Sequence, residues 1–325
     1  MKNYTVRLYQ KNDYENWNVF IGKAKNATFL FHRSFMEYHS DRFNDYSLII
    51  EDGTKWVAVL PANRVENQVF SHQGLTYGGL VYDEKLKLAA VLEVFKTTLI
   101  FLESQNCSQL QIKLMPFFYS DVASDELNYA LFLAEAKLNR RDTCALIDLQ
   151  RNFSFAKDRL RGIEKGKNFD LEIKEEPNFE LFWNEILIPN LADNHQATPV
   201  HKLDEIIKLH QLFPKNIRQF NVYHKNKIVA GTTIFETKNV AHSQYISGNT
   251  DKNKLGSVDF LHAHLLQNVF KEKKFFDFGI SNENQGKNLN EGLSYWKESF
   301  GANIAVQDFY EVPTANYTLL ENVLV

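Results

Sequence analysis

Cysteine is scarce in this sequence: Cys107 and Cys144 are the two examples in 325 residues, and no Cys-x-x-Cys pair occurs. A disulfide framework or a structural zinc site needs more thiols at closer spacing. The sequence therefore argues against both kinds of site, and we expect two buried, unreactive thiols.

Long apolar runs are missing as well. No stretch approaches the roughly 18 residues that a membrane-spanning helix needs, and the first residues, MKNYT, lack the apolar segment of a signal peptide. Hydrophobic residues make up 44% of the chain and charged residues 24%, which is typical of a folded globular protein. We therefore expect a cytoplasmic protein.

The sequence also has no large excess of positive or of negative charge. The chain has 37 Lys and Arg against 40 Asp and Glu, a net charge of −3, so it produces no overall field that favours nucleic acid, and we expect no DNA partner. Basic residues nevertheless outnumber acidic ones five to two between residues 157 and 167. Either a solvated connecting helix or a surface for a phosphate-rich ligand explains this segment.

Histidines at the spacing of a metal-binding pair are also lacking. His195, His201 and His210 are six and nine residues apart, unlike the His-x-x-x-His pair that a helix presents to zinc. We therefore expect no metal site. His195 and His201 are instead candidates for substrate binding or proton transfer.

A strand, a helix and a second strand are predicted between residues 240 and 280. Residues 240–247 and 275–280 carry the β-branched and aromatic side chains of strands. Ser257 is a suitable N-cap for the helix between them, whose apolar stripe consists of Val258, Leu261, Leu265 and Val269. Such a unit makes its two strands parallel neighbours, and ligands usually bind at the carboxyl ends of such strands.

The same order of elements occurs twice in the chain. Residues 55–58 correspond to residues 227–230 at a shift of 172, and residues 69–72 correspond to residues 240–243 at a shift of 171. A helix and a strand follow in both halves. Because the shift is nearly constant, we interpret the halves as two copies of one α/β module.

A doubled module also suits the length of the chain, at roughly 150 residues per domain. We therefore predict an α/β (α+β) fold of two tandem modules, each a mixed, twisted sheet flanked by helices. The expected boundaries are residues 1–150 for the first module, 151–170 for a basic connecting helix and 171–325 for the second module, which carries the active cleft.

Two segments of the first half are candidates for ligand contact. Residues 28–43 combine many aromatic side chains with polar ones such as Arg33 and His39, which suits either a surface helix or a cleft wall. Tyr77, Gly78 and Gly79 follow in a glycine-rich loop. Such glycines indicate turn geometry or a close approach of backbone to a ligand.

The order of several motifs resembles FemAB-type proteins, which have a double GNAT (acetyltransferase-like) fold. The resemblance is to FemAB-like proteins found with bacterial surface-polysaccharide genes, and it spans roughly residues 15–310. The similar segments are Phe276-Asp-Phe-Gly279 with Gly286 and Trp296-Lys-Glu-Ser-Phe-Gly301, Tyr38-His-Ser-Asp-Arg-Phe43, Ser71-His-Gln-Gly-Leu-Thr-Tyr-Gly-Gly79 and Pro199-Val-His-Lys-Leu203.

The resemblance implies transfer of an acyl or aminoacyl group to an amine of a cell-surface sugar or peptide precursor. The donor would be acyl-CoA or aminoacyl-tRNA, with no tightly bound cofactor. Acetyltransferases hold the CoA pyrophosphate in a glycine-rich loop before a helix, and the corresponding residues 251–257 keep one glycine. The candidate donor-binding residues are Ser247, Lys252, Lys254, Gly256 and Ser257.

Direct attack by the amine is the expected mechanism, because no Ser-His-Asp or Cys-His order demands a covalent intermediate. Asp277 lies within an apolar strand and needs a partner, so it is a candidate base, with Tyr245 as a proton donor and Ser281 at the strand end. Candidate substrate contacts are Gln244, Asn282 and Lys297. The alternatives are an inactive module that binds a ligand or scaffolds an assembly, and tRNA-dependent aminoacyl transfer.

Overall fold

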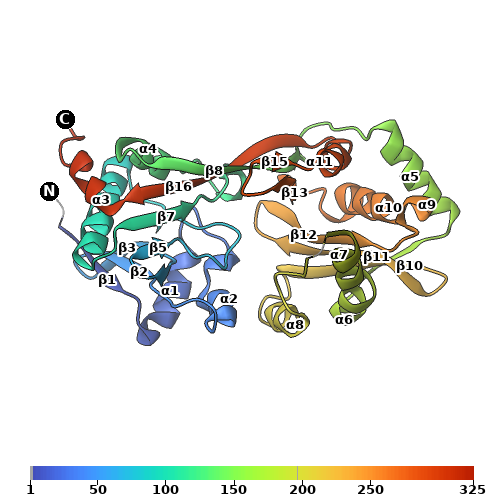
Figure 1. Cartoon of the computed structure of the whole chain (residues 1–325), viewed down its shortest axis with the longest axis horizontal. Coiled ribbons are helices and arrows are strands. Elements are labelled where there is room, and N and C mark those ends of the chain that lie inside the picture. Colours follow the sequence, from blue (N-terminus) through green and yellow to red (C-terminus); the bar gives the residue numbers. More distant parts are fainter. Residues whose placement is uncertain (1–2, 196) are drawn as a thin grey trace. The chain divides into compact units, whose positions relative to one another are not determined.

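The computed structural model describes residues 3–195 and 197–325, without the side chains of residues 194 and 195. The chain folds into two compact units (Figure 1). Unit 1 comprises the chain up to Asp142 together with Gln285–Lys287 and Val306–Val325, and unit 2 comprises Thr143–Asn284 and Asn288–Ala305. The C-terminal segment therefore belongs to unit 1 and residues 151–170 to unit 2. This division differs from the predicted boundaries because local patterns do not record which strand a segment joins.

Unit 1 contains an antiparallel sheet and a mixed one. The antiparallel sheet has the order β1 (Tyr4–Leu8), β2 (Leu48–Asp52), β3 (Lys55–Leu60) and β6 (Val81–Tyr82). The mixed sheet contains β4 (Asn63–Val65), β5 (Gln68–Phe70), β7 (Gln109–Lys113) and the part of β16 (Asn303–Pro313) that lies in this unit, with β5 parallel to β7.

The sequence predicts a helix at residues 85–103 from an apolar stripe at helical spacing, and this segment contains most of the longest helix of unit 1. This helix, α3 (Leu88–Ser104), buries Val91, Phe95 and Leu99 in one core with Leu110 and Ile112 of β7. An apolar stripe at helical spacing therefore predicted both the helix and the face that it buries. The other helices are α1 (Tyr14–Ile21), α2 (Arg33–Met36) and α4 (Glu126–Leu133), with 3-10 turns at Lys11–Asp13, Phe29–Phe31, Glu37–His39, Phe117–Tyr119 and Thr314–Leu320.

Unit 2 is built on one sheet. Its strands follow the order β13 (Phe275–Ile280), β12 (Val240–Gly248), β11 (Lys227–Glu236), β10 (Ile217–His224) and β9 (Glu172–Glu175). The second half of β8 (Lys137–Asp148) pairs with the other edge of β13. All these pairs are antiparallel except β12 with β13, which are parallel as predicted.

Helices lie on both faces of this sheet (Figure 1). Tyr245 and Ser247 of β12 contact the segment of α6 (Phe179–Phe182), a π-helix (Trp183–Leu187), α7 (Ile188–His195) and α8 (Leu203–Leu212). Ile246, which points the opposite way, packs in the core beneath α10 (Ser257–His264) and the π-helix Leu265–Val269. The remaining elements are α9 (Lys252–Leu255), β14 (Asn282–Glu283), β15 (Asn288–Leu289) and α11 (Glu291–Glu298).

Two local predictions in this region are wrong. Ser257 is not the N-cap of α10; Gly256 holds that position in the left-handed conformation, at φ +66°. The sequence also predicts a polar loop at residues 249–256, and in the structure this segment contains the short helix α9. Both differences arise because α5 (Lys157–Asn168) packs on the start of α10, where a Cβ at Gly256 would overlap the carbonyl group of Gly162.

The predicted repeat is present as a repeated parallel ladder. In unit 1, β5 and β7 pair from Gln68↔Gln109 to Phe70↔Gln111. In unit 2, β12 and β13 pair from Val240↔Phe275 to His242↔Asp277. Each ladder is three residue pairs long, and each unit has helices against its sheets, which confirms the predicted class of fold. Among the described residues, no helix is both long and apolar enough to cross a membrane.

Candidate functional site

The two parallel strands of unit 2 diverge after their short ladder. Beyond His242 and Asp277, β12 continues to Gly248 beside β11, whereas β13 continues beside β8, with Ile280 opposite Cys144. Among the described residues, the β13-facing edge of β12 beyond His242 therefore has no partner strand. The result is a V-shaped opening at the carboxyl ends of the strands, where small molecules usually bind in such folds.

A cleft of about 460 Å³ lies at the wide end of this opening. It is formed by the end of β12, the α9–α10 segment, α11 with the residue before it, one residue of α5 and two residues of α7. Its lining is largely apolar, with amides and a few charged groups at the margin, as in many small-molecule sites. The lining residues are Arg159, Asn190, Leu191, Ile246, Ser247, Gly248, Lys252, Asn253, Val258, Asp259, Asn290, Gly292, Leu293 and Trp296.

A His–Asp pair occupies the apex, where the strands are still hydrogen-bonded. His242 Nδ1 lies 2.9 Å from Asp277 Oδ2, and Asp277 Oδ1 accepts a 2.7 Å hydrogen bond from the Gly279 amide. Gly279 has φ +71°, which lets the chain fold back onto the carboxylate. His242 is therefore a hydrogen-bond partner of the kind that the buried Asp277 carboxylate requires. Sequence reasoning missed this pair, although the parallel register places the two residues directly opposite.

Lys297 of α11 contacts the backbone of β13 just after Asp277. Its buried Nζ donates to the Gly279 carbonyl at 3.0 Å and to the Ile280 carbonyl at 2.5 Å. These acceptors lie at the irregularity in the β13–β8 pairing between Asp277 and Ile280. Burial lowers the pKa of the Lys297 ammonium to about 8, against the opposing effect of the Asp277 charge.

Three buried side-chain oxygens near the opening have no hydrogen-bond partner among the described residues. They are Ser243 Oγ and Gln244 Oε1 on β12, and Ser281 Oγ directly after β13. Gln244 is the extra residue of a β-bulge, because Tyr245 pairs with Thr233 and Ser243 pairs with Ile234. Unpartnered buried oxygens are rare in folded proteins, although none of these three residues lines the cleft itself.

Two of the other predicted site residues are held in protein contacts in unit 2. The Tyr245 hydroxyl accepts from the His201 amide at 3.0 Å and lies 2.6 Å from His201 Nδ1, and burial raises the pKa of Tyr245 to about 12. Asn282 Oδ1 accepts from the amide and hydroxyl of Thr143. His195 ends α7, and its side chain lies outside the described part of the chain.

The predicted donor-binding residues come together only in part. Ser247 and Lys252 line the cleft, whereas Lys254 is exposed and does not. Gly256 and Ser257 are buried where α5 packs on the start of α10. The amides that hold a phosphate at a helix N-terminus would have to be reachable, and these two residues are covered.

A carboxylate further reduces the fit for a CoA pyrophosphate. Asp259 lies in the first turn of α10, where it accepts from Arg159 Nη1 at 2.5 Å and from Trp296 Nε1 at 2.9 Å. Burial raises the pKa of Asp259. Because Asp259 neutralises Arg159, Lys252 remains as the unpaired cation among the described lining residues. The site therefore fits a CoA pyrophosphate poorly.

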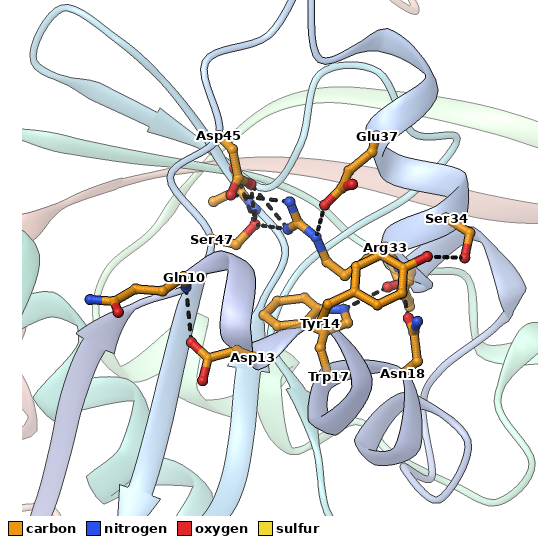
Figure 2. A network of polar contacts seen from close by, with 12 residues as sticks. Gln10, Asp13, Tyr14, Trp17, Asn18, Arg33, Ser34, Glu37, Asp45 and Ser47 are labelled. Carbon is orange, nitrogen blue, oxygen red and sulfur yellow. Dashed lines mark hydrogen bonds and ion pairs between the residues drawn. The ribbon is translucent and has the colours of Figure 1, made fainter.

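The candidates from the first half lie in unit 1. Figure 2 shows the Arg33 guanidinium directed at Glu37, Asp45 and Ser47. The same group lies 3.8 Å from the ring centre of Tyr9. Arg33 is 3% exposed, so its contacts are internal.

The glycine-rich loop of unit 1 fills the place that stays open in unit 2. After the β5–β7 ladder, the Ser71 amide donates to the Gln111 carbonyl and the Gly78 amide donates to the Lys113 carbonyl. The opening beside β7 is therefore closed by the chain itself. Tyr77 donates to or accepts from Thr28 at 2.9 Å, Gly79 adopts φ +107°, and buried His39 stacks on His72.

Comparison with known proteins supports the fold assignment. No protein-family model matches the sequence, and a search of curated proteins finds no match. Among solved structures, FemX is similar with a TM-score of 0.68 and 9% identity, covering 98% of this chain and 99% of that chain.

Two further structures share the architecture. The C-terminal domain of a putative lysylphosphatidylglycerol synthetase from Agrobacterium fabrum has a TM-score of 0.60 and 12% identity, covering 95% of this chain and 94% of its own. A tandem GNAT protein from the clavulanic acid biosynthesis pathway has a TM-score of 0.52 and 8% identity, covering 96% and 99%. The repeated ladder and these similarities identify the chain as a protein with the FemAB-like double GNAT fold.

Proposed function

We propose that unit 2 transfers an acyl or aminoacyl group from a thioester or ester donor to an amine. The observation that carries the proposal is the divergence of β12 and β13 directly after His242 and Asp277, with a 460 Å³ cleft at the wide end. An extended donor arm fits between such strands, with its carbonyl group near the apex and the rest of the donor in the cleft.

The reaction forms a C–N bond and breaks the C–S or C–O bond of the donor. The amine must be uncharged when it attacks, the tetrahedral oxyanion needs donors, and the leaving group takes up a proton. Amides on the unpaired edge of β12 beyond His242 are the proposed oxyanion donors. Tyr245, whose raised pKa keeps its phenol protonated, is the proposed acid for the leaving group.

The acceptor binds on the polar side of the opening in this proposal. Ser281 offers a buried hydroxyl that has no partner in the described part of the chain, and its carbonyl group accepts from the amide of Asn290, which lines the cleft. Short polar side chains of this kind suit an amino sugar or the amine of a peptide. The proposed class of acceptor is therefore the amine of a cell-surface sugar or peptide precursor.

A product assay tests the proposal. Purified protein is incubated with acyl-CoA thioesters or with aminoacyl-tRNAs, together with amino sugars and short peptides, and mass spectrometry monitors the acceptor mass. We expect one donor class to add its acyl mass to an amine. Because the α10 terminus suits a pyrophosphate poorly, we expect the ester donor to be used better. Unchanged acceptors with both donor classes would contradict the proposal.

A further inference from the structure

His242 has the geometry of an oriented base. Its Nδ1 is fixed by Asp277 Oδ2 at 2.9 Å, and the second oxygen of Asp277 is fixed by the Gly279 amide. A carboxylate that accepts two hydrogen bonds is stabilised in its charged form. It then holds the imidazole with its proton on Nδ1, so that Nε2 carries the lone pair.

The second ring nitrogen of His242 is open. No hydrogen bond to Nε2 occurs among the described residues, and this atom is not one of the buried polar atoms that lack a partner. The side chain is 12% exposed, against 3% for that of Asp277. One nitrogen is therefore held by the protein, while the other is left for solvent or a ligand.

The position of His242 coincides with the point where the strands separate. It is the last residue of β12 that pairs with β13, and the bulge at Gln244 follows two residues later. A donor arm that runs along β12 from the cleft therefore approaches His242 with its carbonyl end.

The other titratable groups at the apex are already engaged. Lys297 donates to the carbonyl groups of Gly279 and Ile280. Cys144, on β8, is buried, and Asp277 faces His242. On the same face of β12 as His242, beyond the bulge, the Tyr245 hydroxyl contacts His201. His242 is thus the base at the apex, among the described residues, with an unoccupied nitrogen.

We infer that His242 is the general base of the transfer reaction and that Asp277 is its positioning residue. The inference rests on the proposed function and assigns the proton acceptor within it. As the amine attacks the donor carbonyl, its proton passes to His242 Nε2 and the imidazole becomes positively charged. The Asp277 carboxylate stabilises that charge. The leaving thiolate or alkoxide takes its proton from Tyr245, which is reprotonated from water, and His242 releases its own proton to water, which restores the neutral imidazole.

The test compares His242→Gln, Asp277→Asn and His264→Gln with the wild-type protein. His264 is the matched control, because it lies on α10 of the same unit and contacts Asn268. We expect His242→Gln to lower kcat by about 100-fold or more, with KM nearly unchanged, and Asp277→Asn to lower kcat by about 10-fold or more because the imidazole loses its orientation. His264→Gln should match the wild type.

Two further readouts separate catalysis from structure. The fall in wild-type rate at low pH should be absent in His242→Gln. Added imidazole should raise the rate of His242→Ala by at least about ten-fold over its rate without imidazole. Each variant is first compared with the wild type by thermal unfolding. A His242→Gln protein with wild-type rate and pH profile would overturn the inference alone. Absence of transfer by the wild type would overturn the proposed function and the role of His242 with it.

Discussion

At the scale of single residues, two buried histidines of unit 1 make the stability of the protein depend on pH. His39 and His72 stack with ring centres 4.8 Å apart, and both are less than 5% exposed. Burial lowers the pKa of His39 to about 4 and that of His72 to about 3. The unfolded chain therefore takes up protons as the pH falls below about 6.5, while the native state does not.

We predict that the free energy of unfolding falls as the pH is lowered from 7 to 5, by about 1.4 kcal/mol per pH unit for each such histidine once the unfolded form is protonated. His39→Met should reduce this slope by about one proton. It should cost little stability at pH 7, since neither ring nitrogen of His39 has a partner among the described residues. Denaturant unfolding at several pH values measures the slope. The same slope in His39→Met would contradict the account.

Arg33 was a candidate for ligand contact in the sequence, whereas in the structure its guanidinium makes contacts within unit 1. Its guanidinium contacts Glu37, Asp45 and Ser47 while buried, so its removal leaves carboxylates without their partner. We predict that Arg33→Met lowers the free energy of unfolding by about 1–3 kcal/mol, because Ser47 loses a partner and the two carboxylates stay partly solvated. Arg151→Met, which removes an exposed ion pair with Asp148, should change it by less than about 1 kcal/mol. A stable Arg33→Met protein would restore the predicted role in substrate binding.

The sequence predicted part of the site at this scale. Asp277 stood out because a carboxylate inside an apolar strand requires a partner. His242 did not stand out in the sequence, because its pairing with Asp277 depends on the register between two strands that lie 35 residues apart in the chain. Periodicity defines the faces of each strand but not their alignment. Arg33 and Gly78 attracted attention as unusual residue types, and their contacts proved to be internal.

At the scale of elements, α5 has one exposed face and one packed face. Lys157, Arg161, Lys165 and Lys167 are exposed, as on a solvated helix, whereas Gly162 and Gly166 lie buried against Asp259 and Phe260. Glycines four residues apart allow two helices to approach closely, as the α5–α10 contact requires. Ion pairing between Arg159 and Asp259 adds to the same contact.

We predict that Gly166→Ala destabilises unit 2. A Cβ at Gly166 would lie 2.5 Å from Phe260 Cβ, so the helices must separate at a cost of about 1–3 kcal/mol. Gly292→Ala is the matched control, because a Cβ there meets nothing closer than 4.0 Å. That change should stabilise α11 by about 0.5–1 kcal/mol. Equal unfolding midpoints for the two variants would contradict the proposed contact.

Strong periodic elements were predictable and their ends were not. The helix α3 and the parallel pair β12–β13 follow from apolar spacing in the sequence. The start of α10 did not, because Gly256 adopts a left-handed conformation where α5 packs against it. Residues 71–79 close the opening in unit 1. The sequence did not predict this, because it depends on hydrogen bonds between distant segments.

At the scale of the whole molecule, duplication explains the architecture and divergence explains the site. The constant shift between halves predicted two copies of one module, and each unit indeed has a three-pair parallel ladder. The two copies differ beyond the parallel ladder. Residues 71–79 of the chain fill this position in unit 1, whereas unit 2 has a cleft there. The C-terminal segment returns to unit 1, which a linear division of the sequence does not reveal.

The most direct test of the account is to fill the cleft of unit 2 and measure transfer. Leu293 lines the cleft and is 40% exposed, so Leu293→Trp should fill the mouth at little cost to folding. Leu212→Trp, on α8 of the same unit and 47% exposed, is the control. We predict that the wild type and Leu212→Trp form acylated amine by mass spectrometry while Leu293→Trp loses at least about 90% of the rate, as expected for a blocked donor site. Equal rates for all three proteins would contradict the central claim that the donor occupies the opening between β12 and β13.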